Sequence, residues 1–416
     1  MDQQVSTDQL CIGMYVYIDL HWSKHPFLRQ AFRIKDATEI DTIRGLGLDS
    51  IRFNPGKSKA KPLEPVAEVA EPKTSISPEP VVEEPAPDPE MEEKNKKIAK
   101  QKERRKKAKV CEQAFTESVR CLSKLFGSQV PVAEAVVEAK ELVDGVCGSM
   151  IQAEDVALQL INMEAQSPSR YAHVMNVLVL SMMIGNRIGL TEDEMHVLGL
   201  GALYHDIGIS ELPGQVANKT TRLTEPEFEI YKRHPLIGAA TAQRQGYLPR
   251  DAMRVLAEHH ENVDGSGYPR GLKGDQMNRY SKIVSLVNAY DNLTNNLDGD
   301  RELTPHEAVS IIFSRDNNRY EPQVLNVFVS ILGVYPPGTF VTLSDHRIGI
   351  VNSVRREQLL FPEVMIYDAD VPSDEALILD IKEEGLSIKA TLKPAEISRV
   401  VKEYLSMGST GYYFDS

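Results

Sequence analysis

The hydrophobic pattern at the start of the chain predicts a small module of mixed secondary structure. Residues 14–20 (MYVYIDL) are rich in apolar and β-favouring side chains, which is typical of a strand. Residues 36–47 (DATEIDTIRGLG) follow a helical pattern and end on glycine, which often closes helices. We therefore expect residues 1–57 to form a small α+β module.

The next segment lacks the pattern of a folded core. Residues 62–90 are dominated by proline, glutamate and alanine and contain no aromatic residue, so they cannot bury enough apolar surface to fold. We expect residues 58–93 to be a disordered linker. Residues 94–109 form a basic block without aromatic residues for base stacking, and we expect residues 94–135 to be a solvated helical lead-in.

Apolar residues then recur at spacings of three and four, as in helices that bury one face. The clearest runs are residues 136–151, 174–189 and 193–206. Thr224 and Glu227 form a capping-box pattern, and Pro235 opens a further helix with His234 at its boundary. We expect residues 136–335 to form an all-helical domain.

The pattern changes to alternation after residue 336. Strands are expected over residues 338–354, 361–368 and 377–380. A helix is expected over residues 394–407, before Gly408. Residues 336–416 are therefore predicted to be a strand-rich extension with a terminal helix, and the fold class of the whole chain is mainly α.

Composition excludes several functions. The 416 residues carry a formal net charge of −13, which disfavours a nucleic-acid partner because a polyanion would be repelled. The four cysteines are widely spaced without a CxxC pair, which argues against a zinc knuckle or a disulfide framework. The most apolar run, residues 174–185, is too short to span a bilayer core of about 30 Å. We expect a cytoplasmic protein without a membrane span.

Histidines at helix ends are the main candidates for chemistry. His205 is followed directly by Asp206 at the polar end of an apolar helix, and His259 and His260 end another. Adjacent helical residues point about 100° apart, so we expect His259 and His260 to serve different ions of a close pair. The carboxylate of Asp206 has two oxygens and can bridge both ions. Such a pair supplies a nucleophile at neutral pH and clamps a phosphoryl group.

Several ordered blocks resemble the HD-GYP family, a branch of the HD superfamily of metal-dependent phosphohydrolases. The matching residues are His173, 205-HDIG-208, 234-HPLIG-238 and 259-HHENVDGSGYP-269. The resemblance covers roughly residues 165–335. Residues 5–55 resemble the small domain that often precedes HD-GYP domains in bacteria, and residues 333–345 the strand-rich extension that often follows them. The resemblance implies an all-helical HD-type metallohydrolase core and hydrolysis of cyclic di-GMP to pGpG or GMP, in second-messenger signalling of biofilm formation and motility.

Carried over position by position, the resemblance implies a ligand set and a substrate wall. The implied ligands of two divalent ions, iron or manganese, are His173, His205, Asp206, His234, His259 and His260. Asp206 would bridge the ions, and His205 and Asp206 form the catalytic pair. The implied wall of the substrate site consists of Asp264, Gly265, Gly267, Tyr268 and Pro269. Glycines there permit positive φ and close approach of the backbone to a ligand.

The sequence departs from the family pattern at two metal-binding positions. Asn288, in 287-VNAYDNL-293, replaces the aspartate that is the last ligand, and its neutral amide is a weaker ligand for a dication. Asp291 lies one turn further along the same helix face and is a candidate to compensate. Ser169 replaces a glutamate of the members with three metals, so two ions are expected rather than three.

Two further departures remove positive charge from the expected substrate site. Ile209 replaces the lysine that follows the HD motif. Leu297 and Asp300 replace basic residues of a phosphate-binding segment, where the adjacent Arg301 is a weak substitute. Single groups of this kind are often worth a few kcal/mol of transition-state stabilisation.

Two histidines are not expected to bind metal. His196 lies nine residues before His205, on the opposite side of the same helix. His306 follows Thr304 and Pro305 in a helix-start pattern, and we expect it at the surface.

Three functions are compatible with these sequence features. The intact ligand set favours a cyclic di-GMP phosphodiesterase. The lost charges favour a receptor or scaffold that binds a cyclic dinucleotide with little turnover and signals to protein partners through residues 1–57. A third interpretation keeps hydrolysis but changes the substrate to another cyclic dinucleotide or a linear nucleotide. A homodimer is compatible with each of them.

Overall fold

The structure, a computed structural model, describes residues 3–18, 31–48, 50–63, 106, 109–111, 113–122, 132–149, 154–163, 170–219, 221–295, 303–355, 357–369, 371, 373 and 376–405. The chain forms two compact units, Met1–Gln101 and Lys102–Ser416. Some predicted features lie outside the described residues, namely the linker from residue 64 onward, most of the basic block, Ser169, Leu297, Asp300 and Arg301.

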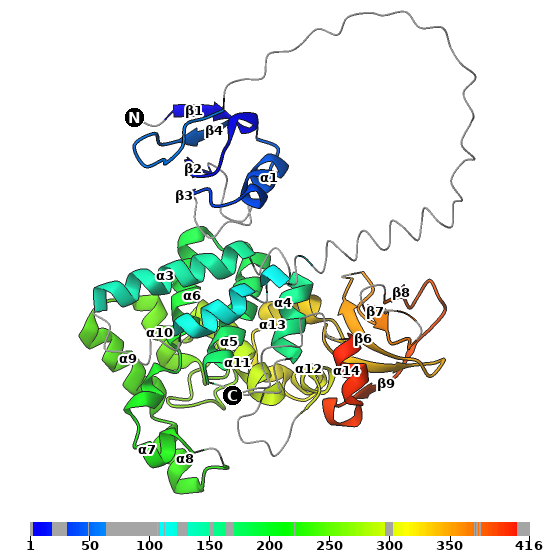
Figure 1. Cartoon of the computed structure of the whole chain (residues 1–416). Helices are drawn as coiled ribbons and strands as arrows, with labels where there is room; N and C mark the ends of the chain where they lie inside the picture. Colours follow the sequence, from blue (N-terminus) through cyan, green and yellow to red (C-terminus); the bar gives the residue numbers. More distant parts are fainter. Residues whose placement is uncertain are drawn as a thin grey trace, which may run out of the picture. The chain divides into compact units, whose positions relative to one another are not determined.

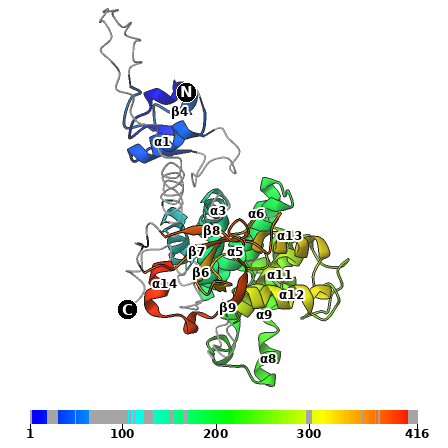
Figure 2. The same cartoon turned by 90° about the vertical axis from the view of Figure 1, so that its right-hand side faces the viewer.

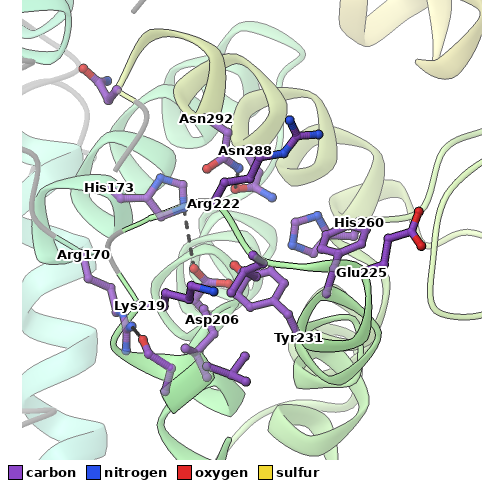
Figure 3. A pocket seen from close by; sticks show the side chains of 16 residues that line it. Arg170, His173, Asp206, Lys219, Arg222, Glu225, Tyr231, His260, Asn288 and Asn292 are labelled. Atoms are coloured by element: carbon purple, nitrogen blue, oxygen red, sulfur yellow. Dashed lines mark hydrogen bonds and ion pairs between the residues drawn. The ribbon is translucent and has the colours of Figure 1, made fainter. Parts of the chain in front are cut away.

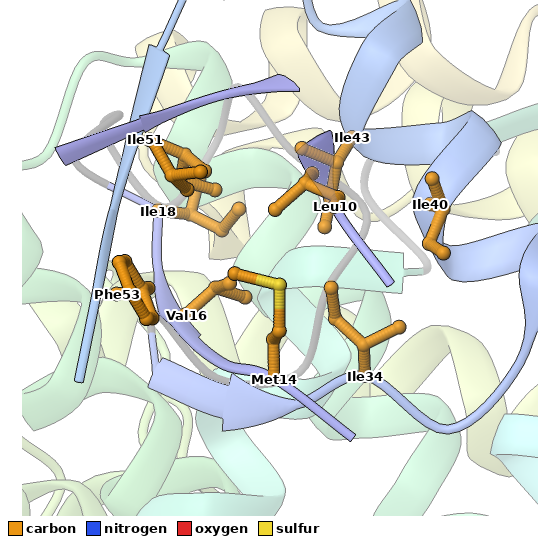
Figure 4. Close-up of a cluster of buried hydrophobic side chains, with 10 residues drawn as sticks. Leu10, Met14, Val16, Ile18, Ile34, Ile40, Ile43, Ile51 and Phe53 are labelled. Carbon is orange, nitrogen blue, oxygen red and sulfur yellow. The ribbon is translucent and has the colours of Figure 1, made fainter. Parts of the chain in front are cut away.

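Among its described residues, the N-terminal unit contains an antiparallel sheet, the 3-10 helix η1 (Thr7–Gln9) and one α-helix, in agreement with the predicted α+β class. In spatial order the strands are β1 (Gln3–Ser6), β4 (Ser50–Phe53), β2 (Tyr15–Tyr17) and β3 (Ala31–Arg33). Helix α1 (Ala37–Gly45) begins after Asp36, whose side chain accepts a hydrogen bond from the Glu39 N–H at 3.0 Å. Figure 4 shows the core of this unit, with Leu10, Met14, Val16, Ile18, Ile34, Ile40, Ile43, Ile51 and Phe53.

The larger unit is built mainly of helices (Figure 1). They are α3 (Val132–Ser149), α4 (Glu154–Met163), α5 (Arg170–Arg187), α6 (Glu192–Tyr204), η4 (Ile207–Glu211), α7 (Gly214–Ala217), α8 (Glu225–Tyr231), α9 (His234–Gln245), α10 (Arg250–Glu258), α11 (Arg279–Thr294), α12 (Pro305–Ser314), η5 (Asn317–Arg319) and α13 (Pro322–Leu332). The predicted capping box of Thr224 and Glu227 is confirmed at the start of α8.

Helix α5 is the central element of this unit (Figures 1 and 2). It packs against α3, α4, α6, α11 and α13. Residues Ala172 to Gly185 of α5 are all buried, which explains a sequence that is apolar all round. His173 lies in the first turn of this helix and is therefore held by the core itself. Among the described residues, no helix has the length and hydropathy needed to cross a membrane.

A five-stranded antiparallel sheet follows the helices. Its spatial order is β8 (Ile378–Asp380), β7 (Glu363–Ile366), β6 (Ile348–Ser353), β5 (Phe340–Leu343) and β9 (Ile388–Leu392). The predicted hairpin and the two further strands are confirmed, whereas β9 was not predicted. The predicted helix 394–407 is wrong at its start, because Pro394–Glu396 form a 3-10 turn and α14 spans Arg399–Leu405. Gln159 of α4 donates to the carbonyl oxygens of Val351 and Asn352, which ties this sheet to the helices.

Candidate metal centre and substrate pocket

Helix ends bring the predicted ligands together. His205 caps the C-terminus of α6 and Asp206 follows it, while His234 is the first residue of α9. His259 caps the C-terminus of α10 and His260 is the next residue. Because α6 packs against α5 and α10, and α9 against α10 and η4, these ends meet at one point.

A close approach of two glycines sets the distance between Asp206 and His234. A Cβ atom on Gly208, in η4, would lie 2.1 Å from the carbonyl oxygen of His234 and 2.6 Å from the nitrogen of Gly238. Both neighbours are backbone atoms and cannot rotate away. Glycine at position 208 therefore allows the start of α9 to pack directly on the turn that follows Asp206.

The carboxylate of Asp206 lies between two pairs of imidazoles. Its Oδ1 is 3.3 Å from Nε2 of His234 and 3.5 Å from Nε2 of His259. Its Oδ2 is 3.5 Å from Nε2 of His205 and 3.7 Å from Nε2 of His173. Each oxygen thus faces its own pair of ring nitrogens, which is the arrangement that a bridging carboxylate requires.

Two groups of side chains could each hold a metal ion. One group is His173, His205 and Asp206, and the other is Asp206, His234, His259 and His260. The expectation that His259 and His260 serve different ions is contradicted, because both belong to the second group. The 100° spacing applies only inside a helix, and α10 ends at Glu258, so the ring centroids of His259 and His260 approach to 4.3 Å.

Hydrogen bonds fix the tautomers of three imidazoles. Nδ1 of His205, His234 and His259 lies 2.7, 2.8 and 2.9 Å from the carbonyl oxygens of Ala202, Tyr231 and Leu256. A carbonyl oxygen only accepts, so each Nδ1 carries the proton and each Nε2 presents a lone pair toward Asp206. Orientation of a metal-ligating histidine by a carbonyl on its other nitrogen is the usual arrangement around metals.

These lone pairs need a cation. Nε2 of His234 and Nε2 of His259 are 3.1 Å apart, and those of His173 and His205 are 3.2 Å apart. In addition, the buried Nε2 of His260 has no hydrogen-bond partner among the described residues. Imidazole with carboxylate is a donor set for divalent ions such as iron, zinc and manganese. The residues present therefore fit a divalent metal centre.

The protonation states also suit metal binding. Burial lowers the pKa of His205 to about 3, and burial also lowers the pKa values of His259 and His260. Neutral imidazoles and an ionised carboxylate are the forms that ligate metals.

Asp291 orients His173 rather than replacing the missing ligand. Its Oδ2 lies 2.6 Å from Nδ1 of His173, and its Oδ1 accepts hydrogen bonds from Asn176 at 2.9 Å and Asn295 at 2.7 Å. Although burial opposes the effect, the hydrogen bond and charge of Asp291 raise the pKa of His173. The expectation that Asp291 compensates for Asn288 as a ligand is therefore wrong: Asp291 lies behind the imidazole and belongs to neither group.

We expect Asp291→Asn to lower metal affinity by about 10- to 100-fold, as is typical when the partner of a ligating histidine is lost. The amide keeps the shape of the carboxylate but removes the charge that holds the His173 ring. Metal retained against a graded series of chelators measures the effect. Asp316→Asn, a carboxylate held by Arg315 outside both groups, is the matched control. Equal retention by the two variants would contradict the role of Asp291.

A pocket of about 440 Å³ opens beside the two groups (Figure 3). Its described lining residues are Arg170, His173, Asp206, Ile209, Val216, Ala217, Lys219, Arg222, Leu223, Glu225, Phe228, Tyr231, His260, Asn288, Asn292 and Asn295. His173, Asp206 and His260 from the candidate metal centre therefore face the same space. Asn288 is buried there, and its Oδ1 accepts a hydrogen bond from Asn292 at 2.9 Å.

Basic side chains enter this pocket from places that sequence reasoning missed. Ile209, at the expected lysine position, packs in an apolar cluster with Leu212 and Val216 and brings no charge. Among the described lining residues, the cations are Arg170, at the start of α5, and Lys219 and Arg222, between α7 and α8. The run 219-KTTR-222 was the available signal, but its position relative to the metal ligands is decided only by the fold.

The GYP turn, residues 267–269, packs against the candidate metal centre. The Tyr268 ring stacks on His260, with ring centroids 4.5 Å apart and an angle of 18° between the planes. A Cβ atom on Gly267 would lie 2.4 Å from the nitrogen of Asn262, so glycine allows this close return of the chain. The buried carboxylate of Glu261, which the sequence did not indicate, accepts from the N–H groups of Arg270 at 2.7 Å and Leu272 at 2.9 Å.

The turn does not itself line the pocket. Asp264 accepts hydrogen bonds from the N–H and hydroxyl of Ser266 and so caps the turn. The predicted wall residues Asp264, Gly265, Gly267, Tyr268 and Pro269 are absent from the described lining of the pocket. The wall is formed instead by His260 and by Phe228 and Tyr231 of α8.

His196 and His306, which were not expected to bind metal, lie outside both groups. His196 pairs with Asp144, at 2.6 Å between Nε2 and Oδ1. His306, which was expected at the surface, is partly exposed. Its Nδ1 donates to the carbonyl oxygen of Val334 at 2.6 Å, and its ring stacks on Tyr335 at 4.6 Å.

The pair of His196 and Asp144 predicts a pH-dependent contribution to stability. The hydrogen bond that His196 donates to Asp144, opposed by burial, raises the pKa of His196 above its ordinary value of 6.5. The stabilisation is complete below about pH 6.5 and is lost as the pH rises through the folded-state value. We expect Asp144→Asn to lower the free energy of unfolding at pH ~6 by less than about 1 kcal/mol, and by nothing at pH ~9. Urea unfolding at both pH values measures it, and an equal loss at both would contradict the assignment.

The chain is similar to known proteins along its length. The profile of the HD domain matches residues 155–324, and that of a domain of unknown function (DUF3391) matches residues 2–129. The cyclic di-GMP phosphodiesterase PA4108 of Pseudomonas aeruginosa is 26% identical, over 100% of this chain and 99% of that protein. The cyclic di-GMP phosphodiesterase PdeB of Borreliella burgdorferi is 27% identical, over 56% of this chain and 62% of that protein. Among solved structures, the HDG"Y"P protein Bd1817 from Bdellovibrio bacteriovorus aligns with a TM-score of 0.45 and 16% identity, over 80% of this chain and 99% of that chain.

Proposed function

We propose that this chain, which belongs to the HD domain family and carries the signature of its HD-GYP branch, is a metal-dependent phosphodiesterase that hydrolyses cyclic di-GMP. The products would be pGpG, GMP or both. The single observation that carries the proposal is the position of Asp206, whose two carboxylate oxygens face separate pairs of imidazoles beside a pocket with three basic side chains. The names of the relatives support the choice of substrate.

Two divalent ions, iron or manganese, are proposed for the two groups. When bound, such a pair supplies a nucleophile at neutral pH and neutralises charge on the phosphoryl oxygens. His173 and His205 would hold one ion, and His234, His259 and His260 the other, with Asp206 shared. Asn288 would be a neutral and weak further ligand beside His173.

The remaining pocket residues would position the substrate. The net charge of the chain is −13, so a dianionic dinucleotide needs local positive charge in order to bind. Lys219 and Arg170 bring positive charge to the wall of the pocket. Tyr268, stacked on His260, keeps that ligand in place. Holding the phosphodiester in one orientation is a large part of catalysis by metal pairs.

Turnover of cyclic di-GMP by the full-length protein tests the proposal. The protein would be reconstituted without oxygen with Fe(II) or Mn(II), and the products separated by chromatography. We expect metal-dependent formation of pGpG or GMP that disappears in the His205→Ala/Asp206→Ala double variant. Turnover that survives in the double variant, or that never appears with either metal, would refute a phosphodiesterase at this centre.

A second function, that of a cyclic-dinucleotide receptor, is favoured by two specific observations. Asn288 places a neutral amide where the HD-GYP pattern has a carboxylate, and Ile209 is buried in an apolar cluster where the pattern has a lysine. Both features weaken catalysis more than binding, because they act on charge that develops in the transition state. Saturable binding of cyclic di-GMP by metal-loaded protein that shows no turnover would select this alternative.

A further inference from the structure

We propose that Arg222 positions the substrate by binding the phosphate of the cyclic dinucleotide that is not being cleaved. This inference rests on the proposed function, since it concerns the substrate of the same centre. A cyclic dinucleotide contains two phosphodiesters, and only one of them can lie against the candidate metal ligands at a time. The second phosphate needs its own cation.

The position of Arg222 in the pocket agrees with such a role. The side chains that would hold the metals are buried or nearly so, whereas Arg222 is exposed on the segment between α7 and α8. Arg222 lines the same pocket as the candidate ligands His173 and His260. Figure 3 shows His173 on one side of Arg222 and His260 on the other. A phosphate bound at the ligands would lie on the floor of the pocket, and its partner in the ring would lie nearer the exposed rim.

The other two cations of the pocket are already engaged. Lys219 forms an ion pair with Glu227, at 2.5 Å between Nζ and Oε2. Arg170 donates to the carbonyl oxygen of Ala217 at 2.5 Å. For Arg222, the described residues provide no hydrogen bond or ion pair. Among the described lining residues, its guanidinium is therefore the cation whose donors are all available, and its planar fork suits two oxygens of one phosphate.

The uncharged and acidic residues of the described lining cannot serve this purpose. Ile209 is apolar, and Asn288 and Asn292 are neutral and bonded to each other. Glu225, also at the exposed part of the wall, is negative and would repel a phosphate. Without Arg222, the described lining residues would offer the second phosphate only Lys219, which is paired with Glu227, and Arg170, which donates to the carbonyl oxygen of Ala217.

Kinetics with two substrates test the inference. We expect Arg222→Ala to raise KM for cyclic di-GMP by roughly 10- to 100-fold with little change in kcat, as for loss of a charge-assisted pair of hydrogen bonds. Hydrolysis of bis(p-nitrophenyl) phosphate, which has a single phosphate, should be unchanged. Arg222→Lys should recover part of the affinity, and the dependence of KM on salt should become weaker in Arg222→Ala.

Arg250→Ala is the matched control, because Arg250 is an exposed arginine at the start of α10 outside the lining of the pocket. An unchanged KM in Arg222→Ala, or equal losses with both substrates, would overturn the inference while leaving the phosphodiesterase intact. If the wild type shows no turnover, the proposed function fails. Equilibrium dialysis with cyclic di-GMP then decides whether Arg222 contributes to binding of the dinucleotide. A 10- to 100-fold weaker affinity of Arg222→Ala would then support the role of Arg222, and equal affinity or no binding by the wild type would overturn it.

Discussion

Replacement of Asp206 by asparagine should abolish turnover, with a loss of at least about 10³-fold, the largest effect expected from any single change in this chain. Each carboxylate oxygen of Asp206 faces one pair of imidazoles. In asparagine, one of these oxygens is replaced by an NH2 group, which is a hydrogen-bond donor and faces the Nε2 lone pairs of that pair. Metal content measured by mass spectrometry should fall from the proposed two ions per chain to one at most.

Asp144→Asn is the matched control for this experiment. It also removes a carboxylate that pairs with a histidine, but His196 and Asp144 lie outside both candidate metal groups. We expect this control to keep full turnover and full metal content at neutral pH. A wild-type metal content in Asp206→Asn would show that the five imidazoles hold the ions without a bridge, contrary to the geometry.

A methyl group at position 208 should produce the second large effect. In Gly208→Ala the new Cβ would be 2.1 Å from the carbonyl oxygen of His234, so α9 has to move away from the turn after Asp206. Overpacking of this kind typically costs about 1–3 kcal/mol of unfolding free energy. Displacement of His234 by about 1 Å is enough to lower turnover by about 100-fold. Urea unfolding and initial rates measure the two effects separately.

Gly214→Ala, in the short helix α7 that follows, tests whether the effect is local. Its new Cβ would meet nothing closer than Asn218, at 3.8 Å, so stability and turnover should both be unchanged. If Gly208→Ala retained wild-type turnover, the contact between η4 and α9 would not be what positions His234.

Local sequence signals were sufficient to predict the helices that carry the ligands. The apolar periodicity of residues 193–206 and the proline at 235 placed His205 and His234 at helix boundaries, and α6 and α9 have those boundaries. Such signals are local, because a helix forms when its own residues can bury one face and satisfy its ends. The C-terminal strands, apart from β9, were also predicted from a local signal, the alternation of apolar and polar residues along each strand.

Predictions that depended on the direction in which a side chain points were less successful. His259 and His260 were assigned to different ions by helical geometry, but the helix ends at Glu258 and both rings turn to the same group. Asp291 has the spacing of a ligand beside Asn288, yet its carboxylate binds the far side of the His173 ring and the amides of Asn176 and Asn295. Spacing along a helix defines a face, and only the packed neighbours define what that face meets.

The sequence by itself therefore determined which residues could ligate metal and at which helix ends they lie. The tertiary structure alone decided that Asp206 divides its two oxygens between two pairs of imidazoles, and that Lys219 and Arg222 bring the positive charge that Ile209 lacks. The physical reason is that ligand chemistry belongs to single side chains and their local helix. Shared coordination and the charge of a pocket arise from distances between segments that are far apart in the chain, and those distances are set by packing of the whole core.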